Sequence, residues 1–167
     1  GTYLRTFGGV GGPNKCAKFY GARQFTIHND QIYVADFYNK KIKVVDLEGN
    51  CIRNTTTTLN PHGIAVNNDY VFYSDPRRSI GKLGRNNLND LGFQTFGAVN
   101  VSWGFGMSLN NAGNKLVVAN ANRNSGGRKF TEFNVSGSTL TVANRSSRGN
   151  ISLDADYDSS GNIFGTI

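Results

Sequence analysis

The residues Gln31-Ile32-Tyr33-Val34-Ala35-Asp36 place an apolar, β-branched centre between polar ends, which is typical of a buried β-strand. Similar stretches recur over 70–75 (YVFYSD), 115–120 (KLVVAN) and 162–167 (NIFGTI). Successive stretches start 39, 45 and 47 residues apart. Such a regular recurrence indicates repeated structural units.

Each of these stretches follows a second apolar stretch and a short polar turn, which together indicate a β-hairpin. A third strand and a weaker fourth strand follow. In the first unit we expect strands over 24–28, 32–36, 41–46 and 51–58. Four short strands in a unit of about 40 to 47 residues are typical of one blade of a β-propeller. We name these strands a to d, from the centre of the propeller outward.

The sequence therefore predicts an all-β fold, a β-propeller of four-stranded antiparallel blades, with about three and a half blades in this chain. Within a single domain over 1–167, the expected parts are an orphan outer strand over 1–8, blades over 24–58, 63–97 and 105–143, and a partial blade over 151–167. We interpret the chain as a piece of a longer propeller. The alternative is that a partner supplies the missing strands.

Composition limits the classes of protein that this chain can belong to. The sequence has no apolar run near 18 residues, which excludes a membrane-spanning segment and membrane insertion. Its 21 glycines and abundant Asn, Ser and Thr disfavour long helices. A formal net charge of +7 makes an anionic partner worth testing.

Several stretches match a pattern known from one family of propellers. An outer strand ending in Phe-Gly lies at 3–8, and IYVAD with Asn39, Ile42, Val44, Asp46 and Gly49 follows within 32–49. This arrangement resembles the NHL repeat, and residues 61–66 (PHGIAV) are similar to the family's entry into strand a. Residues 73–75 (YSD) resemble the YWTD propellers of receptor ectodomains. The third unit departs from the family pattern, because Ala119-Asn120 replaces the usual Ala-Asp.

The resemblance implies a binding platform in most relatives and an enzyme in a minority of them. We expect a non-enzymatic binding or structural module without a cofactor, because the inner strands offer few His, Asp or Glu. The alternatives are a metal-dependent lyase or lactonase-like enzyme and an RNA-binding NHL domain. NHL-like lyases bind metal through several histidines, for which His62 is a weak candidate. The chain has only His28 and His62, so we expect no metal site.

The loops between strands b and c are expected to carry a basic binding surface, since propeller topology places them all on one face. The candidates are Lys40, Lys41, Arg77, Arg78, Arg123, Arg128 and Lys129. Phe37 and Tyr38 could supply stacking surfaces beside them. We expect a protein partner or self-assembly here, with an acidic glycan or RNA as further anionic candidates. The alternative is a merely solvated rim.

Two features suggest an extracellular, cell-surface or virion protein. Five Asn-X-Ser/Thr sequons, at Asn54, Asn100, Asn134, Asn144 and Asn150, make the chain a candidate glycoprotein. All five fall outside the expected inner strands, where a glycan could be tolerated. Cys16 and Cys51 are either one disulfide or two buried thiols.

Overall fold

A computed structural model gives the chain an all-β fold, described for residues 2–3, 5–96, 104–120, 130–146 and 154–166. Fourteen strands and no helix occur in these residues, so none of their segments is a helix able to span a membrane. The strands are β1 (Ala22–His28), β2 (Gln31–Asp36), β3 (Lys41–Asp46), β4 (Cys51–Thr56), β5 (Ile64–Val66), β6 (Tyr70–Asp75), β7 (Ser79–Gly84), β8 (Asp90–Thr95), β9 (Gly104–Leu109), β10 (Lys115–Asn120), β11 (Phe130–Ser136), β12 (Thr139–Arg145), β13 (Asp154–Tyr157) and β14 (Ile163–Thr166).

The strands form three four-stranded antiparallel sheets and one hairpin. The first sheet has the order β1-β2-β3-β4, the second β5-β6-β7-β8 and the third β9-β10-β11-β12, while β13 pairs with β14. Each sheet is thus a meander in which neighbours in sequence are neighbours in space. The strands expected over 24–28, 32–36 and 41–46 are confirmed as β1, β2 and β3.

Three hairpin turns share one five-residue sequence pattern. The first residue is Asp or Asn, the fourth is Gly and the fifth is Asn. The pattern occurs at 46–50, 110–114 and 158–162. In each turn the first side chain accepts a hydrogen bond from the last backbone N–H, at 2.7, 3.1 and 2.8 Å. The glycines have φ values of 88°, 68° and 81°, which other residues rarely adopt. Short polar sequences therefore fix these hairpins.

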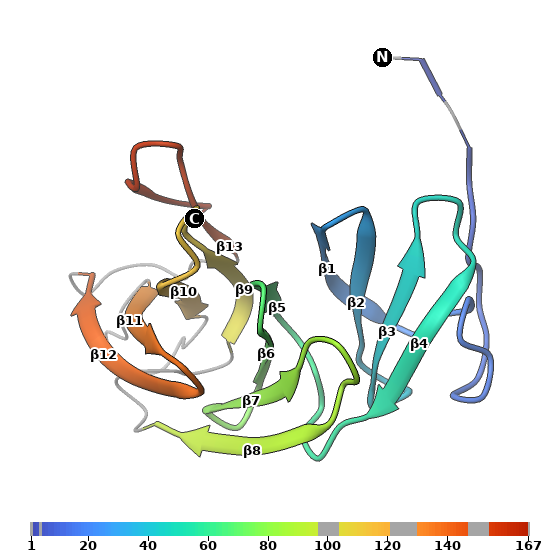
Figure 1. The fold of residues 1–167 in the computed structure, drawn as a ribbon, viewed down its shortest axis with the longest axis horizontal. Helices are drawn as coiled ribbons and strands as arrows, with labels where there is room; N and C mark the ends of the chain where they lie inside the picture. The colour runs from blue at the N-terminus through green and yellow to red at the C-terminus, as the bar shows by residue number, and fades with distance from the viewer. Residues whose placement is uncertain (1, 4, 97–103, 121–129, 147–153, 167) are drawn as a thin grey trace.

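The sheets are arranged around a common centre, with β1, β5, β9 and β13 innermost and in contact from one to the next (Figure 1). Neighbouring sheets pack face to face through buried apolar side chains. Tyr33 of the first sheet packs in one cluster with Ile64 of the second, and Phe72 of the second packs with Phe133 of the third. Ala155 of β13 continues the series against the third sheet. The wedges between the sheets therefore contain the core.

Gln24 ties three innermost strands together near the centre. Its Oε1 accepts hydrogen bonds from Ile64 N of β5 at 2.7 Å and from Met107 N of β9 at 3.2 Å. Its Nε2 donates to Met107 O at 3.2 Å. One amide on β1 thereby satisfies backbone groups of two other sheets.

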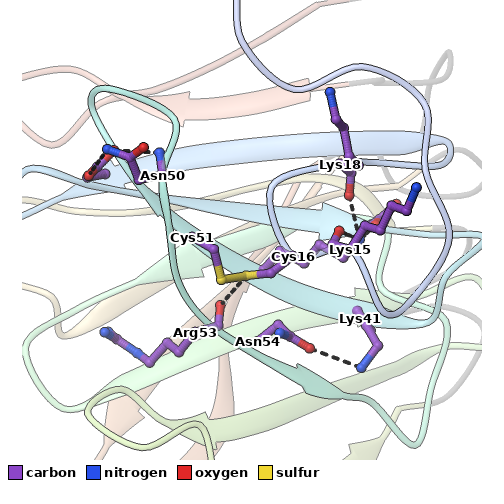
Figure 2. Close-up of a disulfide and its surroundings, with 11 residues drawn as sticks. Lys15, Cys16, Lys18, Lys41, Asn50, Cys51, Arg53 and Asn54 are labelled. Atoms are coloured by element: carbon purple, nitrogen blue, oxygen red, sulfur yellow. Dashed lines mark hydrogen bonds and ion pairs between the residues drawn. A yellow bond between two sulfur atoms is a disulfide. The ribbon is translucent and has the colours of Figure 1, made fainter.

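The segment 8–21 lies over the face of the first sheet that is turned away from the second. Ile42 and Val44 belong to the cluster with the second sheet, so Lys43 between them points to the opposite face. There its Nζ donates to the carbonyls of Lys15 and Lys18 at 3.1 and 2.5 Å. A disulfide from Cys16 to Cys51 at the start of β4 attaches the same segment (Figure 2).

A fully buried ion pair lies under this segment. Lys43 Nζ is 2.7 Å from Asp36 Oδ2, and neither side chain is exposed to solvent. Asp36 also accepts hydrogen bonds from Tyr20 N and Asn39 Nδ2, each at 2.7 Å. Both charges are therefore paired and hydrogen bonded, which buried ions require.

The outer strand expected over 1–8 is not observed, since none of the described residues in this range is in a strand. Instead, Phe7 packs so closely against Gly49 in the β3–β4 turn that a side chain at Gly49 would overlap the ring. Arg5 is 3.7 Å from Glu48 in the same turn. A strand needs a neighbouring strand to pair with, and this segment contacts a turn.

We predict that Lys43→Met destabilises the protein by about 3–5 kcal/mol, because it leaves the Asp36 carboxylate buried without its cation. The double variant Lys43→Met/Asp36→Asn should recover part of this loss, since the amide keeps an acceptor for Tyr20 N. Chemical denaturation of the single and double variants measures both effects. Equal destabilisation of the two variants would show that the loss comes from altered packing.

Candidate binding site

The described loops between strands b and c carry exposed basic side chains. Lys40 in the β2–β3 loop and Arg77 and Arg78 in the β6–β7 loop are exposed. Lys41 is half-buried and donates to Asn54 Oδ1 and Thr56 Oγ1, at 3.0 and 3.2 Å. Arg123, Arg128 and Lys129 lie outside the described residues. The surface that the structure describes is therefore formed by Lys40, Arg77 and Arg78, which we call the basic loop surface.

The two loops hold their basic residues in the same way. Lys40 and Arg78 each precede strand c and have positive φ values of 51° and 77°. The Lys40 carbonyl accepts a hydrogen bond from Thr57 N at 2.9 Å, and the Arg78 carbonyl accepts one from Phe96 N at 2.8 Å. Each loop is thus attached to the end of its own outer strand, which limits backbone freedom under the charged side chains.

The carboxylates that border the loops are turned inward. Asp36 and Asp75 end strand b of the first two sheets and are buried. Asp75 accepts hydrogen bonds from Arg77 N at 2.6 Å and Asn60 N at 3.0 Å. Because Asp75 binds the Arg77 backbone N–H and Asp36 is paired with Lys43, both carboxylates are turned away from solvent, and the basic side chains remain the exposed part of this surface.

Aromatic rings lie beside Lys40. Tyr38 is 57% exposed and its ring centroid is 5.1 Å from that of Tyr20, which is 52% exposed. The Arg23 guanidinium is 5.1 Å from the Phe37 ring centroid and 5.7 Å from that of Tyr38. The Arg23 guanidinium thus packs against Phe37 and Tyr38. The sequence alone does not identify this contact, because Arg23 is remote from the b to c loops in sequence. The cluster offers exposed planar surface and positive charge together.

His62 is enclosed by aromatic rings. Its centroid is 4.3 Å from that of Phe105 and 5.4 Å from that of Phe37, both edge-on, and 7% of the residue is exposed. Burial, assisted by the Arg23 charge, lowers the pKa of His62 to about 4. Within the described ranges, no group of three His, Cys, Asp or Glu could hold a metal ion. His62 is therefore placed as a neutral packing side chain between the first three sheets.

Three of the five sequons fall on described residues. Asn54 lies on β4, Asn134 on β11 and Asn144 on β12, and all three are exposed. Asn100 and Asn150 lie outside the described residues. None of the three described asparagines is on an innermost strand.

The radial arrangement of antiparallel sheets around a centre defines a β-propeller, in which the described residues form three four-stranded blades and one hairpin. No protein-family model and no curated protein sequence matches the chain. Similarity is found instead among solved structures, where it shows the fold alone.

The chain is similar to hydrazine synthase from Kuenenia stuttgartiensis, with 11% identity, a TM-score of 0.69 and coverage of 92% of this chain and 44% of that chain. The structure of the mitotic checkpoint complex matches with 10% identity, a TM-score of 0.68 and coverages of 87% and 47%. A Bacteroides fragilis protein, proposed to be a 6-phosphogluconolactonase, matches with 12% identity, a TM-score of 0.67 and coverages of 86% and 47%. The chain spans a little under half the length of these structures.

We predict that the pKa of His62 makes stability depend on pH. An unfolded histidine takes up a proton near pH 6.5 and folded His62 only near pH 4, so protons favour the unfolded state between these values. Unfolding free energy should therefore fall by up to about 3 kcal/mol as the pH drops from 6.5 to 4. Urea unfolding at several pH values should show that the His62→Phe variant lacks this fall in unfolding free energy. An unchanged dependence of the unfolding free energy on pH in the variant would contradict its attribution to His62.

Proposed function

We propose that this chain is a non-enzymatic β-propeller binding module that engages an acidic segment of a protein partner. The observation that carries the proposal is the basic loop surface itself. Lys40, Arg77 and Arg78 are exposed on two adjacent loops, while the carboxylates beside them are buried. An acidic partner would therefore meet uncompensated positive charge.

The aromatic rings beside Lys40 support recognition of a polypeptide. Exposed Tyr20 and Tyr38 offer the amphipathic, rigid contact area that is enriched in protein interfaces. Arg23 is held against Phe37 and Tyr38, so its charge lies next to a preordered apolar patch. Side chains that are already ordered lose less entropy when a partner binds.

The similarity to known folds supports the same class of function. One of the similar structures is a checkpoint complex, which is a protein assembly. We further propose that the repeat is NHL-like, because its characteristic string coincides with β2 and places Tyr33 and Ala35 in the core. Family membership of this kind favours a binding platform.

We predict that Arg77→Gln/Arg78→Gln weakens binding of a fluorescein-labelled decaglutamate peptide about tenfold, equivalent to about 1.4 kcal/mol. Binding should also become less sensitive to salt, because fewer charged contacts remain to be screened. Fluorescence anisotropy at several salt concentrations measures both quantities.

The charge-matched control is Arg5→Gln/Lys115→Gln, which removes two exposed positive charges remote from the b to c loops. It should leave affinity and salt slope close to those of the parent protein. An equal loss of peptide affinity in both double variants would mean that binding depends only on the net charge of the protein. Stronger binding of oligouridine or heparin fragments than of the peptide would favour the RNA or glycan alternative.

We also propose that the protein is extracellular or surface-exposed. The Cys16–Cys51 disulfide supports an oxidising compartment, where such bonds persist. The exposure of Asn54, Asn134 and Asn144 supports access of these sequons to glycosylation.

We predict that secretory expression in mammalian cells adds N-glycans at Asn54, Asn134 and Asn144. Intact mass before and after removal of N-glycans should differ by whole glycans, and mutation of each Asn to Gln should remove one adduct. A secreted protein whose mass equals that of the bare chain would contradict the glycoprotein proposal.

A further inference from the structure

A hollow of about 700 Å³ lies at the opposite ends of the strands from the basic loop surface. It is surrounded by β1, β5, β9 and β13 and by the turns that follow β5 and β9. In a propeller this region is the inner end of the blades, where four strands contribute side chains to one space. Neither the basic loop surface nor the aromatic cluster contributes to its wall.

Asparagine side chains build the wall of this hollow. Asn67 Oδ1 accepts a hydrogen bond from Tyr70 N at 2.8 Å, and its Nδ2 donates to Gly113 O at 3.1 Å, which joins the turns of two sheets. Asn68 Oδ1 lies 3.1 Å from His28 Nε2 on β1. The β5–β6 turn is therefore fixed by its own amides and linked to the neighbouring sheets on both sides.

Other polar groups of the wall face solvent. Asn68, Asp69 and Asn111 are exposed on the two turns, and Asp156 is exposed on β13. Asp156 is oriented by hydrogen bonds from Ser108 Oγ and from Tyr157 N, the latter at 2.8 Å. The hollow thus presents both donors and acceptors, held on rigid turns and strands.

The charge of the hollow is opposite to that of the protein as a whole. Asp69, Asp154 and Asp156 belong to its wall, whereas no Lys or Arg does among the described residues that form it. The chain has a formal net charge of +7, and one basic side chain that borders the wall is Arg85, whose Nε donates to Asn68 O at 2.6 Å from outside the hollow. Phosphate, sulfate and carboxylate ligands are disfavoured in this hollow by repulsion.

The hollow also has an apolar element. Phe25 and Ile27 of β1 belong to its wall and are 63% and 56% exposed. An exposed aromatic ring beside fixed amides and carboxylates matches a ligand with an apolar face and a hydroxylated edge. We propose that this hollow is a binding site for an uncharged saccharide, whose ring packs on Phe25 and whose hydroxyls bind the asparagine and aspartate side chains.

The test is an NMR titration of the ¹⁵N-labelled chain, produced without glycosylation, with glucose, galactose, mannose, N-acetylglucosamine, maltotriose and chitotriose. At least one sugar should bind with a Kd of about 1 mM or tighter and shift the side-chain amide resonances of Asn68 and Asn111. Phe25→Ala and Asp69→Asn should each weaken that binding about fivefold.

Matched controls are Phe164→Ala and Asp30→Asn, which change an equally exposed ring and an exposed carboxylate outside the hollow. Both should leave the Kd unchanged. The proposal fails if no sugar shifts the Asn68 and Asn111 amides, or if the controls weaken binding as much as the wall variants. It also fails if glucose 6-phosphate or spermidine binds the hollow more tightly than every neutral sugar, because recognition would then rest on charge.

Discussion

The buried pairing of Asp36 with Lys43 constrains the whole amino-terminal part of the structure. A carboxylate and an ammonium can both lose their water only if each is fully hydrogen bonded. Asp36 meets this condition through the Tyr20 backbone, and Lys43 through the carbonyls of Lys15 and Lys18. The segment 8–21 is therefore the means by which the ion pair is satisfied, and the disulfide keeps that segment in place.

The second and third sheets have different polar groups at the position of Asp36. Asp75 occupies the position of Asp36 in the second sheet and binds Asn60 N, which again belongs to the connection entering the blade. In the third sheet Asn120 donates to Thr131 Oγ1 at 3.2 Å, a neutral pair at the positions of Asp36 and Lys43. The end of strand b is thus the point where each described blade holds a polar anchor. In the first blade the anchor is paired with buried Lys43, which also binds the carbonyls of Lys15 and Lys18 in the segment 8–21.

The periodic apolar stretches were sufficient to predict the sheets, because the b strands, which are buried on both faces, require continuous apolar residues. Isolated polar residues of these strands could not be interpreted in the same way. Nothing in the sequence around Gln24 reveals that its amide bonds Met107, and Gln94 makes the equivalent pair of bonds to Leu140 of the next sheet. Such contacts depend on how closely the sheets pack against one another, which is a property of the assembled sheets. The outer strand over 1–8 stays a prediction for a related reason, since a strand forms only beside a partner strand and the described residues place none next to this segment.

The different side chains of the a to b turns and of the b to c loops follow from the turn chemistry. Turns between strands a and b are short, and their Asn and Asp side chains bind neighbouring backbone N–H groups, as Asn67 and Asn110 do. A lysine or arginine cannot accept such a hydrogen bond, so basic residues are excluded from these positions. In the b to c loops the buried Asp75 binds the backbone of Arg77 and the buried Asp36 binds the side chain of Asn39, which leaves the other loop positions free to carry Lys40, Arg77 and Arg78. The requirement to satisfy backbone N–H groups therefore makes the a to b turns rich in acceptors and leaves the b to c loops free to carry basic side chains.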